Sequence, residues 1–395
     1  MKQEQPLSNS QHLSNLQKDA ISLLKQLIAI PSFSKEENIT ADTIEKFLQS
    51  KNIKTKRHLN NIWAVNKYSD PGKPTLLLNS HHDTVKPNSG YTLDPFLPFE
   101  KDGKLYGLGS NDAGGSLVSL IATFIHFHEQ EDLSYNLILA ATAEEEISGP
   151  NGIESLLQRK EFLNFAREQN VLPTSKEQVQ VPPDKEREQK DEQWSAVVGE
   201  PTNMQMAIAE KGLLVLNCKA NGKAGHAGRN EGENAIYKAY KDIDWFQNYK
   251  FDKVSDLLGS VKMTITIIET ENKAHNIVPA SCFFVADIRV NELYTFEEIL
   301  KVITSNIESK VVPRSTRLRS SAIALEHPLV KAGLKLGRSY FGSPTTSDKA
   351  LMNFPALKIG PGDSARSHSA DEFIYIDEIK EGIDLYIKLL KDVIL

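Results

Sequence analysis

Three consecutive acids, Glu144-Glu145-Glu146, have the residue type and position that most clearly suggest chemistry. They follow the apolar run Asn136-Leu137-Ile138-Leu139-Ala140, which is typical of a buried strand. Carboxylates at the end of a buried strand need a partner, because an unpaired buried charge is costly. Neighbouring side chains point in different directions, so one of Glu145 and Glu146 could bind a cation while the other moves protons. Taken alone, the triplet would also suit a solvated acidic loop.

Four further polar clusters also stand at the ends of expected strands. They are Ser80–Asp83, Tyr106–Asp112, Gly199–Thr202 and Gly360–Glu372. Residues i and i+2 of a strand point the same way, so His81 and Asp83 face one side and His82 the other. A ligand imidazole is usually supported by a carboxylate or carbonyl, which favours His81 as a metal ligand with Asp83 behind it. His82 would take that place if the register shifted by one residue.

Each cluster alone is more often structural than functional, but together they form a larger pattern. They supply two histidines and three or more carboxylates at the ends of separate strands. In an α/β sheet, active sites lie outside the carboxyl ends of the strands. A set of imidazole and carboxylate ligands of this size can hold two divalent cations, and zinc suits it well.

The five clusters, in this order, resemble the co-catalytic zinc deacylases and exopeptidases. That superfamily includes acetylornithine deacetylase, succinyl-diaminopimelate desuccinylase, aminoacylase and glutamate carboxypeptidase. The matching blocks are His81-x-Asp83, Gly107-x-Gly109-x-x-Asp112, Glu144-Glu145-Glu146, Gly199-Glu200-Pro201-Thr202 and Ser367-His368. The resemblance covers the chain except for residues 158–193.

The resemblance implies a role for each matching residue. It implies two Zn2+ ions, for which Co2+ can substitute, with Asp112 as the bridge between them. The implied metal ligands are His81, Asp112, Glu146, Glu200 and His368, of which His81 and Glu200 complete one site and Glu146 and His368 the other. Glu145 would be the general base that takes a proton from the attacking water and passes it to the leaving amine. Asp83 would orient His81, and a cis peptide bond is expected between Asp112 and Ala113.

A histidine among small residues, His226 in Gly222–Arg229, matches an element with a specific role in relatives. There, an inserted domain dimerises, and this histidine reaches the active site of the partner subunit. It stabilises the oxyanion that forms when the carbonyl is attacked. The resemblance therefore implies that His226 is catalytic and that the protein is a homodimer.

Three further residues match substrate-binding positions. Asn276 and Arg289 correspond to residues that contact the substrate carboxylate in relatives, and arginine suits a carboxylate because it binds it in a bidentate way. Arg289 could instead form an ion pair with Asp287. Thr346 belongs to an element that lines the pocket in relatives, although Thr345 stands where they usually have glycine.

The Glu210-Lys211-Gly212 block and the segment Ser364–Glu372 make the chain most similar to acetylornithine deacetylase-like proteins. The implied reaction converts N2-acetyl-L-ornithine to L-ornithine and acetate, a step of arginine biosynthesis. N-succinyl-L-ornithine and succinyl-diaminopimelate are alternative substrates, and a metallo-dipeptidase or aminopeptidase is an alternative within the superfamily. A succinyl group would need another cation, for which the candidates are Arg366, Lys211 and Arg229. A catalytically inactive binding protein is an alternative of another class, which the complete ligand set disfavours.

Alternating strand and helix patterns predict an α/β domain with helices on both faces of its sheet. The expected helices span 13–30, 35–49, 114–128 and 377–394, and the expected strands span 53–58, 62–66, 74–79, 135–141 and 356–359. The resemblance makes this a zinc-exopeptidase-like catalytic domain with a mixed sheet.

A different pattern interrupts this domain. Strands expected at 213–220, 261–268 and 281–290 alternate with helices at 233–248 and 296–307. This order predicts an inserted α+β sandwich, which the resemblance identifies as a dimerisation (lid) domain. We assign 1–211 and 320–395 to the catalytic domain and 212–319 to the inserted domain. Residues 158–193 are rich in Lys, Glu, Gln and Arg, and are expected to continue a helix and then form a charged surface insertion.

Composition limits the function classes. The chain has 395 residues with 40% hydrophobic and 25% charged residues, which suits a globular protein of two domains. Its net charge of -6 argues against nucleic acid as a partner. Two cysteines exclude a disulfide framework, and no apolar run reaches the ~20 residues of a membrane span. We expect a cytoplasmic enzyme that acts on a small N-acyl amino acid.

Overall fold

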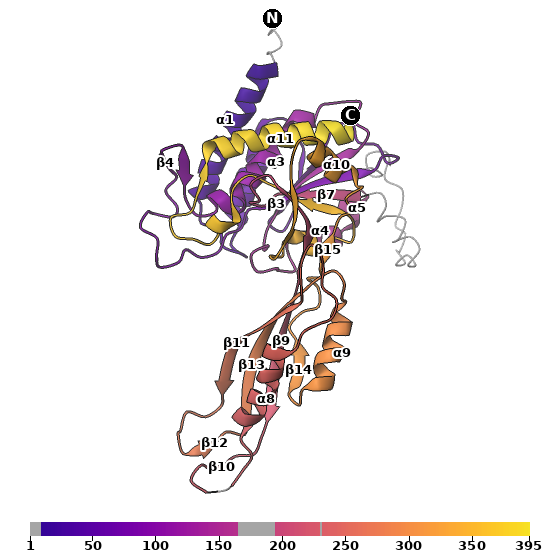
Figure 1. The fold of residues 1–395 in the computed structure, drawn as a ribbon. Coiled ribbons are helices and arrows are strands. Elements are labelled where there is room, and N and C mark those ends of the chain that lie inside the picture. The colour runs from indigo at the N-terminus through magenta and orange to yellow at the C-terminus, as the bar shows by residue number, and fades with distance from the viewer. Residues whose placement is uncertain (1–8, 165–193, 230) are drawn as a thin grey trace, which may run out of the picture. The chain divides into compact units, whose positions relative to one another are not determined.

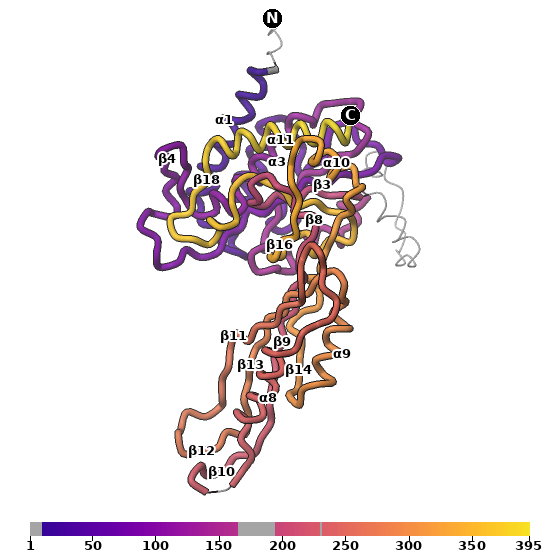
Figure 2. The backbone as a smooth tube through the Cα atoms, in the orientation of Figure 1, coloured from indigo at the N-terminus to yellow at the C-terminus, as the bar shows by residue number. Residues whose placement is uncertain are grey.

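The computed structural model describes residues 9–164, 194–229 and 231–395, which form two compact units (Figure 1; Figure 2). The first comprises the described residues up to Ile208 together with Ile323–Tyr340 and Ser347–Leu395. The second comprises Ala209–Ala322 and Phe341–Thr346. The division therefore differs from the predicted boundaries at Phe341–Thr346, which belongs to the second unit.

A mixed sheet in the order β1-β2-β6-β3-β7-β17-β8 forms the centre of the first unit. Strands β3, β6, β7 and β17 run parallel to one another, whereas β1, β2 and β8 are antiparallel to their neighbours. The strands are β1 Thr55–His58, β2 Asn61–Val65, β3 Thr75–His81, β6 Asn136–Thr142, β7 Trp194–Val198, β8 Met206–Glu210 and β17 Ala356–Lys358. β8 extends into the second unit, where it pairs with β15 (Ser321–Ala322); β16 (Tyr340–Ser343) also pairs with β8.

The central strands are buried on both faces, and side-chain alternation divides them between two cores. In β3, Leu76 and Leu78 pack into one core and Leu77 into the other. In β6, Leu137 and Ile138 divide in the same way. This explains why the two strands read as continuous apolar runs in the sequence.

Helices cover both faces of this sheet (Figure 1). The first core is closed by α1 Asn9–Ile28, α2 Asn38–Ser50, α3 Gly115–Phe127, α10 Pro328–Lys335 and α11 Ile376–Ile394. The second is closed by α4 Ile153–Leu157, α5 Lys160–Leu163 and the short 3-10 helix η2 Asp348–Leu351. A small separate sheet contains β4 Phe99–Lys101, β5 Lys104–Tyr106 and β18 Phe373–Tyr375. The predicted fold class is confirmed.

The second unit is an antiparallel sheet in the order β11-β13-β9-β14 with helices packed on its apolar face. Its elements are β9 Gly212–Asn221, α8 Ala235–Asn248, β11 Lys262–Thr270, β13 Ser281–Val290, α9 Phe296–Asn306 and β14 Lys310–Pro313, with a short pair β10 Gly225–His226 and β12 Ile277–Val278. Alternate residues of β9 and β13 enter the core, among them Cys218 and Cys282. Burial raises the pKa of the Cys218 thiol to about 12, so this cysteine acts as inert packing.

Some predicted elements differ in detail. The helix expected from Lys35 begins at Asn38, because Lys35 has a φ of 77° and donates its backbone N–H to the Glu37 carboxylate at 2.6 Å. The helix expected to continue from Gln158 does not do so, since α4 ends at Leu157 and a separate short helix, α5, follows. The rest of the predicted insertion, 165–193, lies outside the described residues.

No helix within the described ranges has an apolar stretch long enough to cross a membrane.

Replacing Leu78 by alanine tests the sheet core. Leu78 is fully buried at the centre of β3, so Leu78→Ala should lower the free energy of unfolding by about 2–5 kcal/mol. Ile39, at 54% exposure, provides the control, and Ile39→Ala should change it by less than about 0.5 kcal/mol. Urea titration followed by fluorescence, with Trp63 and Trp194 as the reporters in the first unit, measures both. Equal effects of the two substitutions would contradict this description of the core.

Candidate metal centre

The candidate site lies at the carboxyl edge of the parallel strands of the first unit. Strand β3 ends at His81, β6 at Thr142, β7 at Val198 and β17 at Lys358. Because these strands run in the same direction, the segments that follow them meet at one edge of the sheet. Four of the five polar clusters of the sequence are therefore brought together by the sheet itself.

His81 is buried, with 1% of its surface exposed. Its Nδ1 lies 3.0 Å from the carbonyl oxygen of Asp83, which can only accept, so Nδ1 carries a proton and Nε2 is the nitrogen left to bind a metal. Nε2 lies 3.5 Å from Asp112, 3.8 Å from Glu200 and 3.9 Å from Glu145. Among the described residues this buried nitrogen has no hydrogen-bond partner. A metal ligand would have this tautomer and this free nitrogen.

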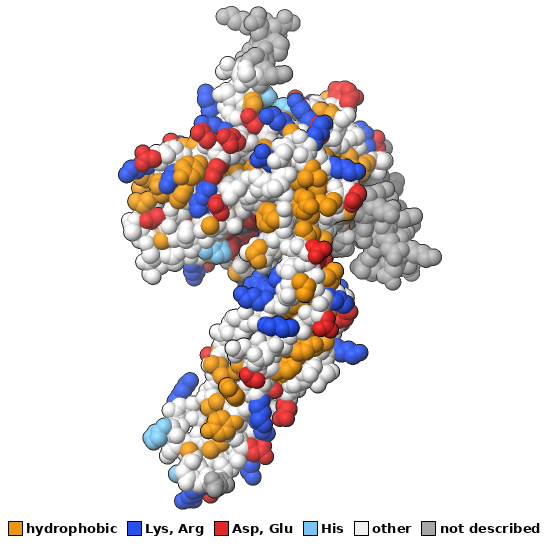
Figure 3. All heavy atoms as spheres, in the orientation of Figure 1, with side chains coloured by type: hydrophobic (Ala, Val, Ile, Leu, Met, Phe, Trp, Pro, Cys, Tyr) orange, Lys and Arg blue, Asp and Glu red, His pale blue; other side chains and the backbone are white. Residues whose placement is uncertain are grey.

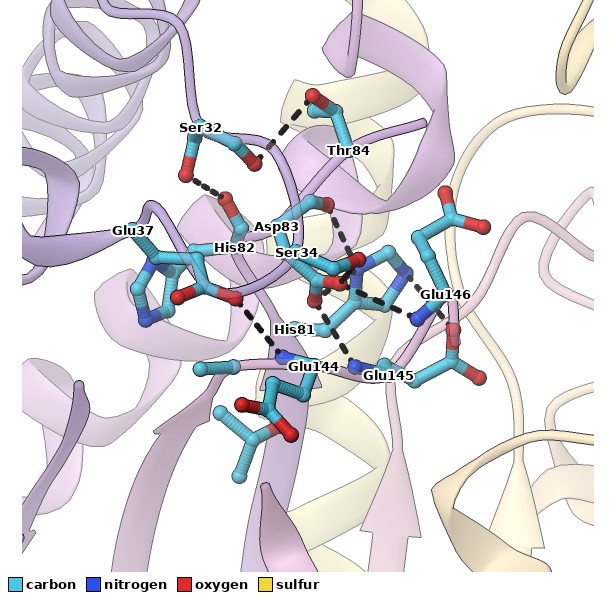
Figure 4. Close-up of polar contacts among 12 residues, drawn as sticks. Ser32, Ser34, Glu37, His81, His82, Asp83, Thr84, Glu144, Glu145 and Glu146 are labelled. Carbon is cyan, nitrogen blue, oxygen red and sulfur yellow. Dashed lines mark hydrogen bonds and ion pairs between the residues drawn. The ribbon is translucent and has the colours of Figure 1, made fainter. Parts of the chain in front are cut away.

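Asp83 holds the acid triplet in place (Figure 4). Its buried carboxylate accepts the backbone N–H groups of Glu145 at 3.1 Å and Glu146 at 3.2 Å. It also accepts the Ser34 hydroxyl at 2.7 Å and lies 3.4 Å from Nδ1 of His81. One side chain therefore fixes both His81 and the two acids beside it.

Two of the neighbouring polar residues point away from the cluster. Glu144 has a φ of 55° and accepts the side-chain amide of Asn151 at 2.9 Å, so its carboxylate is structural. The alternative ligand His82 is engaged at both ring nitrogens, with the Thr40 hydroxyl and the Asn60 carbonyl each at 2.9 Å. The strand register thus places His81, and not His82, at the site.

Asp112 stands in an irregular turn before α3. Gly109 has a φ of 74°, and the peptide bond between Asp112 and Ala113 is cis, as predicted. The carboxylate of Glu372 accepts the backbone N–H groups of Gly109 at 3.2 Å, Asn111 at 2.8 Å and Asp112 at 2.9 Å. The turn is therefore held by a side chain that follows it by 260 residues.

His368 closes the cluster from the last segment. Its backbone has a φ of 58°, and its Nε2 lies 3.0 Å from Glu146 and 3.6 Å from Asp112. The Asn111 side chain joins this segment to the Asp112 turn, because it accepts the N–H of Asp363 at 3.1 Å and donates to its carbonyl at 3.0 Å.

Two groups of side chains have geometry that suits a metal ion. Within each group the ligand atoms lie within 4.8 Å of one another; the first is His81, Asp112 and Glu200, and the second is Asp112, Glu146 and His368. These residues fit two ions, because both groups offer nitrogen and oxygen donors and share Asp112. The orphaned Nε2 of His81 supports the same assignment.

The charges at the site favour a cation. Burial lowers the pKa of the His81 imidazole, but the surrounding carboxylates, with Glu145 first, outweigh burial and hold that pKa well above its usual value. The hydrogen bond to Glu146 raises the pKa of His368 to about 9. Burial raises the pKa of Glu145 well above its usual value. Divalent cations would replace the protons that this excess of negative charge attracts.

Four predicted residues belong to the second unit, His226 and Asn276 among them. His226 is exposed, and its Nδ1 accepts the N–H of Gly228 at 3.1 Å. The pairing of β10 with β12 places it opposite Ile277, next to Asn276, whose carbonyl accepts the N–H of Ala227 at 3.0 Å. The structure thus brings His226 and Asn276 together at one end of the second unit's short strand pair.

Arg289 and Thr346 have partners within the second unit. Arg289 donates to both oxygens of Asp287, at 2.8 and 3.1 Å, which is the ion pair left open as an alternative. The Thr346 hydroxyl donates to the carbonyl of Lys211 at 3.0 Å, and the Lys211 ammonium donates to the carbonyl of Ser260 at 2.8 Å.

Of the other candidate cations, Arg366 donates to both oxygens of Glu378, at 2.8 and 2.6 Å, and both residues belong to the first unit. Arg229 lies 3.8 Å from Glu231.

Sequence reasoning gave no role to Glu372, Asn111 or Ser34. Their contacts join segments far apart in the chain. Glu372 and Asn111 lie in blocks that the sequence singled out, four residues after His368 and directly before Asp112, whereas Ser34 lies in none of them.

Comparisons with known proteins agree with this geometry. Peptidase family M20/M25/M40 matches residues 77–392. Succinyl-diaminopimelate desuccinylase of Rickettsia bellii is 23% identical over 403 residues, which cover 93% of this chain and 95% of the relative. Succinyl-diaminopimelate desuccinylase 2 of a Ruegeria species is 25% identical over 406 residues, with 95% of each covered.

Solved structures show the same fold. The M20 metallo-carboxypeptidase of Sulfolobus solfataricus aligns with a TM-score of 0.67 and 17% identity over 94% of this chain and 98% of that one. Aminopeptidase PepT of Bacillus cereus aligns with a TM-score of 0.68 and 17% identity over 95% and 98%. The family match spans most of the chain, and every residue of both ligand groups lies within residues 77–392. The chain therefore belongs to peptidase family M20/M25/M40 and is a metal-dependent amidohydrolase.

Proposed function

We propose that the protein hydrolyses the N-acyl amide bond of an N-acyl amino acid with the help of two Zn2+ ions. The observation that carries the proposal is the pair of ligand groups that share Asp112, with Glu145 beside them. A solved relative from Bacillus subtilis, the YXEP protein, is described as a dinuclear metal-binding peptidase, which supports the two-ion assignment.

Each residue then has a defined task. His81 and Glu200 would hold one ion, Glu146 and His368 would hold the other, and Asp112 would serve both because it belongs to both groups. The two ions would lower the pKa of a bound water and polarise the scissile carbonyl. Glu145 takes a proton from the attacking water and delivers it to the leaving amine.

Glu145 suits the task of proton transfer. Its carboxylate is part of neither ligand group, although it lies 3.9 Å from Nε2 of His81. Its backbone N–H is held by Asp83, so its side chain leaves the main chain from a fixed point. Burial in an acidic environment raises its pKa, as a group that both accepts and returns a proton requires.

The sequence blocks favour N2-acetyl-L-ornithine as the substrate. The names of the relatives from Rickettsia bellii and Ruegeria favour a second candidate, the removal of a succinyl group. The two candidates share the reaction centre and differ in whether the acyl group brings a second carboxylate.

Steady-state hydrolysis of N-acetyl-ornithine, N-succinyl-ornithine, N-succinyl-diaminopimelate and unblocked dipeptides decides between them. We expect zinc-dependent release of a free amine from at least one N-acyl substrate. Glu145→Gln should reduce kcat about 100- to 10,000-fold while both ions stay bound, because the general base is lost and no ligand is. Turnover of dipeptides alone would contradict the N-acyl assignment and favour a peptidase.

Metal binding should be visible without any substrate. Zinc added to chelator-treated protein should raise the melting temperature. Each occupied site should contribute about 2.7 kcal/mol to the free energy of unfolding when free zinc is a hundredfold above its Kd. Asp112→Asn should remove most of this response, because both ligand groups lose a carboxylate oxygen. Glu36→Gln, at an exposed acid, is the control and should respond as the unchanged protein does. A full response of Asp112→Asn would refute a shared ligand.

We also propose that the second unit forms a homodimer. Strand β11 is the edge of its sheet, and its Ile267 and Ile268 are 44% and 55% exposed. Tyr237 and Tyr240 of α8 are 70% and 67% exposed. Hydrophobic side chains are visible on the surface of this unit (Figure 3). Among the described strands, β11 has a partner on one side only, and such an edge beside exposed aromatic residues favours association with a second copy.

Mixing two inactive variants tests the dimer and the role of His226 together. If His226 acts on the partner subunit's site, a heterodimer of Glu145→Gln and His226→Ala subunits contains one complete site. Subunit exchange should then restore about a quarter of the original activity, because half of the dimers are mixed and one of their two sites is complete. Size-exclusion chromatography with light scattering verifies the dimers, and co-purification of two differently tagged subunits verifies that mixed dimers have formed. Absence of recovery in verified mixed dimers would exclude action across the interface.

A further inference from the structure

We infer that Glu372 is the positioning residue that fixes Asp112, the side chain shared by the two candidate ligand groups. The inference rests on the proposed two-ion site but not on the identity of the substrate. Glu372 belongs to neither ligand group; it accepts hydrogen bonds from the main chain of the turn that carries Asp112.

The Asp112 turn needs an external acceptor. Gly109 is in the left-handed region, and Asp112 has a φ of -116° and a ψ of 100°, so the backbone is not helical at Asp112, although the N–H of Gly114 donates to the carbonyl of Gly109 at 3.0 Å. Three backbone N–H groups, those of Gly109, Asn111 and Asp112, instead donate to the Glu372 carboxylate. The Glu372 side chain is buried, so water does not compete for these donors.

A carboxylate is the side chain that suits these three donors. Its two oxygens offer about four lone-pair positions and no hydrogen. In the structure one oxygen of Glu372 accepts from Asn111 and Asp112, and the other accepts from Gly109. A glutamine of the same size would direct its NH2 group at one of these N–H groups. Size alone would therefore not preserve the contact.

Glu372 also connects two ligands of the same ion. It follows His368 by four residues, and its backbone carbonyl accepts the N–H of Gly107 at 2.9 Å. The segment that carries His368 and the turn that carries Asp112 are therefore joined at the main chain and through the Glu372 side chain. Both His368 and Asp112 belong to the group completed by Glu146.

Asp242 offers a matched control in the second unit. Its buried carboxylate accepts the N–H groups of Glu308 at 3.1 Å and Ser309 at 2.9 Å. The interaction has the same chemistry as that of Glu372, but no member of the ligand groups is attached to it. A merely structural role for Glu372 predicts that both carboxylates behave alike.

The experiment compares the zinc affinity of Glu372→Gln, Asp242→Asn and the unchanged full-length protein, by competition with a chromophoric chelator. Both substitutions should lower the melting temperature. Only Glu372→Gln should weaken zinc binding, by about 10- to 100-fold, as expected for the loss of a group that orients a ligand. Unchanged zinc affinity in Glu372→Gln, or an equal loss in Asp242→Asn, would overturn the inference.

A second variant covers the case in which Glu372→Gln does not fold. Glu372→Asp keeps the charge and both oxygens but withdraws them by one methylene group, so it should fold and still bind zinc more weakly. Unchanged affinity in Glu372→Asp, with Glu372→Gln unfolded, would overturn the inference. Because zinc affinity is measured without substrate, a failure of the proposed reaction would leave this result intact.

Discussion

The crowding of carboxylates at one edge of a buried sheet is the constraint on which the rest of the structure depends. Asp112, Glu145, Glu146 and Glu200 gather around the imidazoles of His81 and His368. Like charges at such distances repel, and burial makes the repulsion stronger. The neighbouring carboxylates raise the pKa of both imidazoles, because their negative charges stabilise a positive charge at this edge of the sheet. Two divalent cations would supply that charge and give the cluster its chemistry.

Buried acids behind the cluster hold its loops in place. Asp83 accepts backbone N–H groups of the acid triplet, and Glu372 accepts those of the Asp112 turn. Glu37 accepts the N–H of Glu144 at 3.2 Å in the same way. The acid triplet and the Asp112 turn lie outside the strands and regular helices, so their N–H groups need acceptors elsewhere. Carboxylates provide them, and the ligands are thereby fixed by side chains that bind no metal.

Much of this arrangement could be predicted from the sequence, because local rules governed it. Strand alternation placed His81 and Asp83 on one side and His82 on the other, and apolar runs predicted the central strands β3 and β6. The anchoring contacts could not be predicted, since Glu372 meets the Asp112 turn across 260 residues. The predicted start of α2 was three residues too early, because the Glu37 side chain accepts a hydrogen bond from the backbone N–H of Lys35. The short strands β4, β5 and β18 carry too few residues for a pattern to form.

The central claim is that two metal ions share Asp112. Crystals of the zinc-loaded protein, with anomalous diffraction measured above and below the zinc absorption edge, test it most directly. We expect two zinc peaks, one among His81, Asp112 and Glu200 and the other among Asp112, Glu146 and His368. A single peak in fully loaded crystals, or two peaks that do not share Asp112, would contradict it.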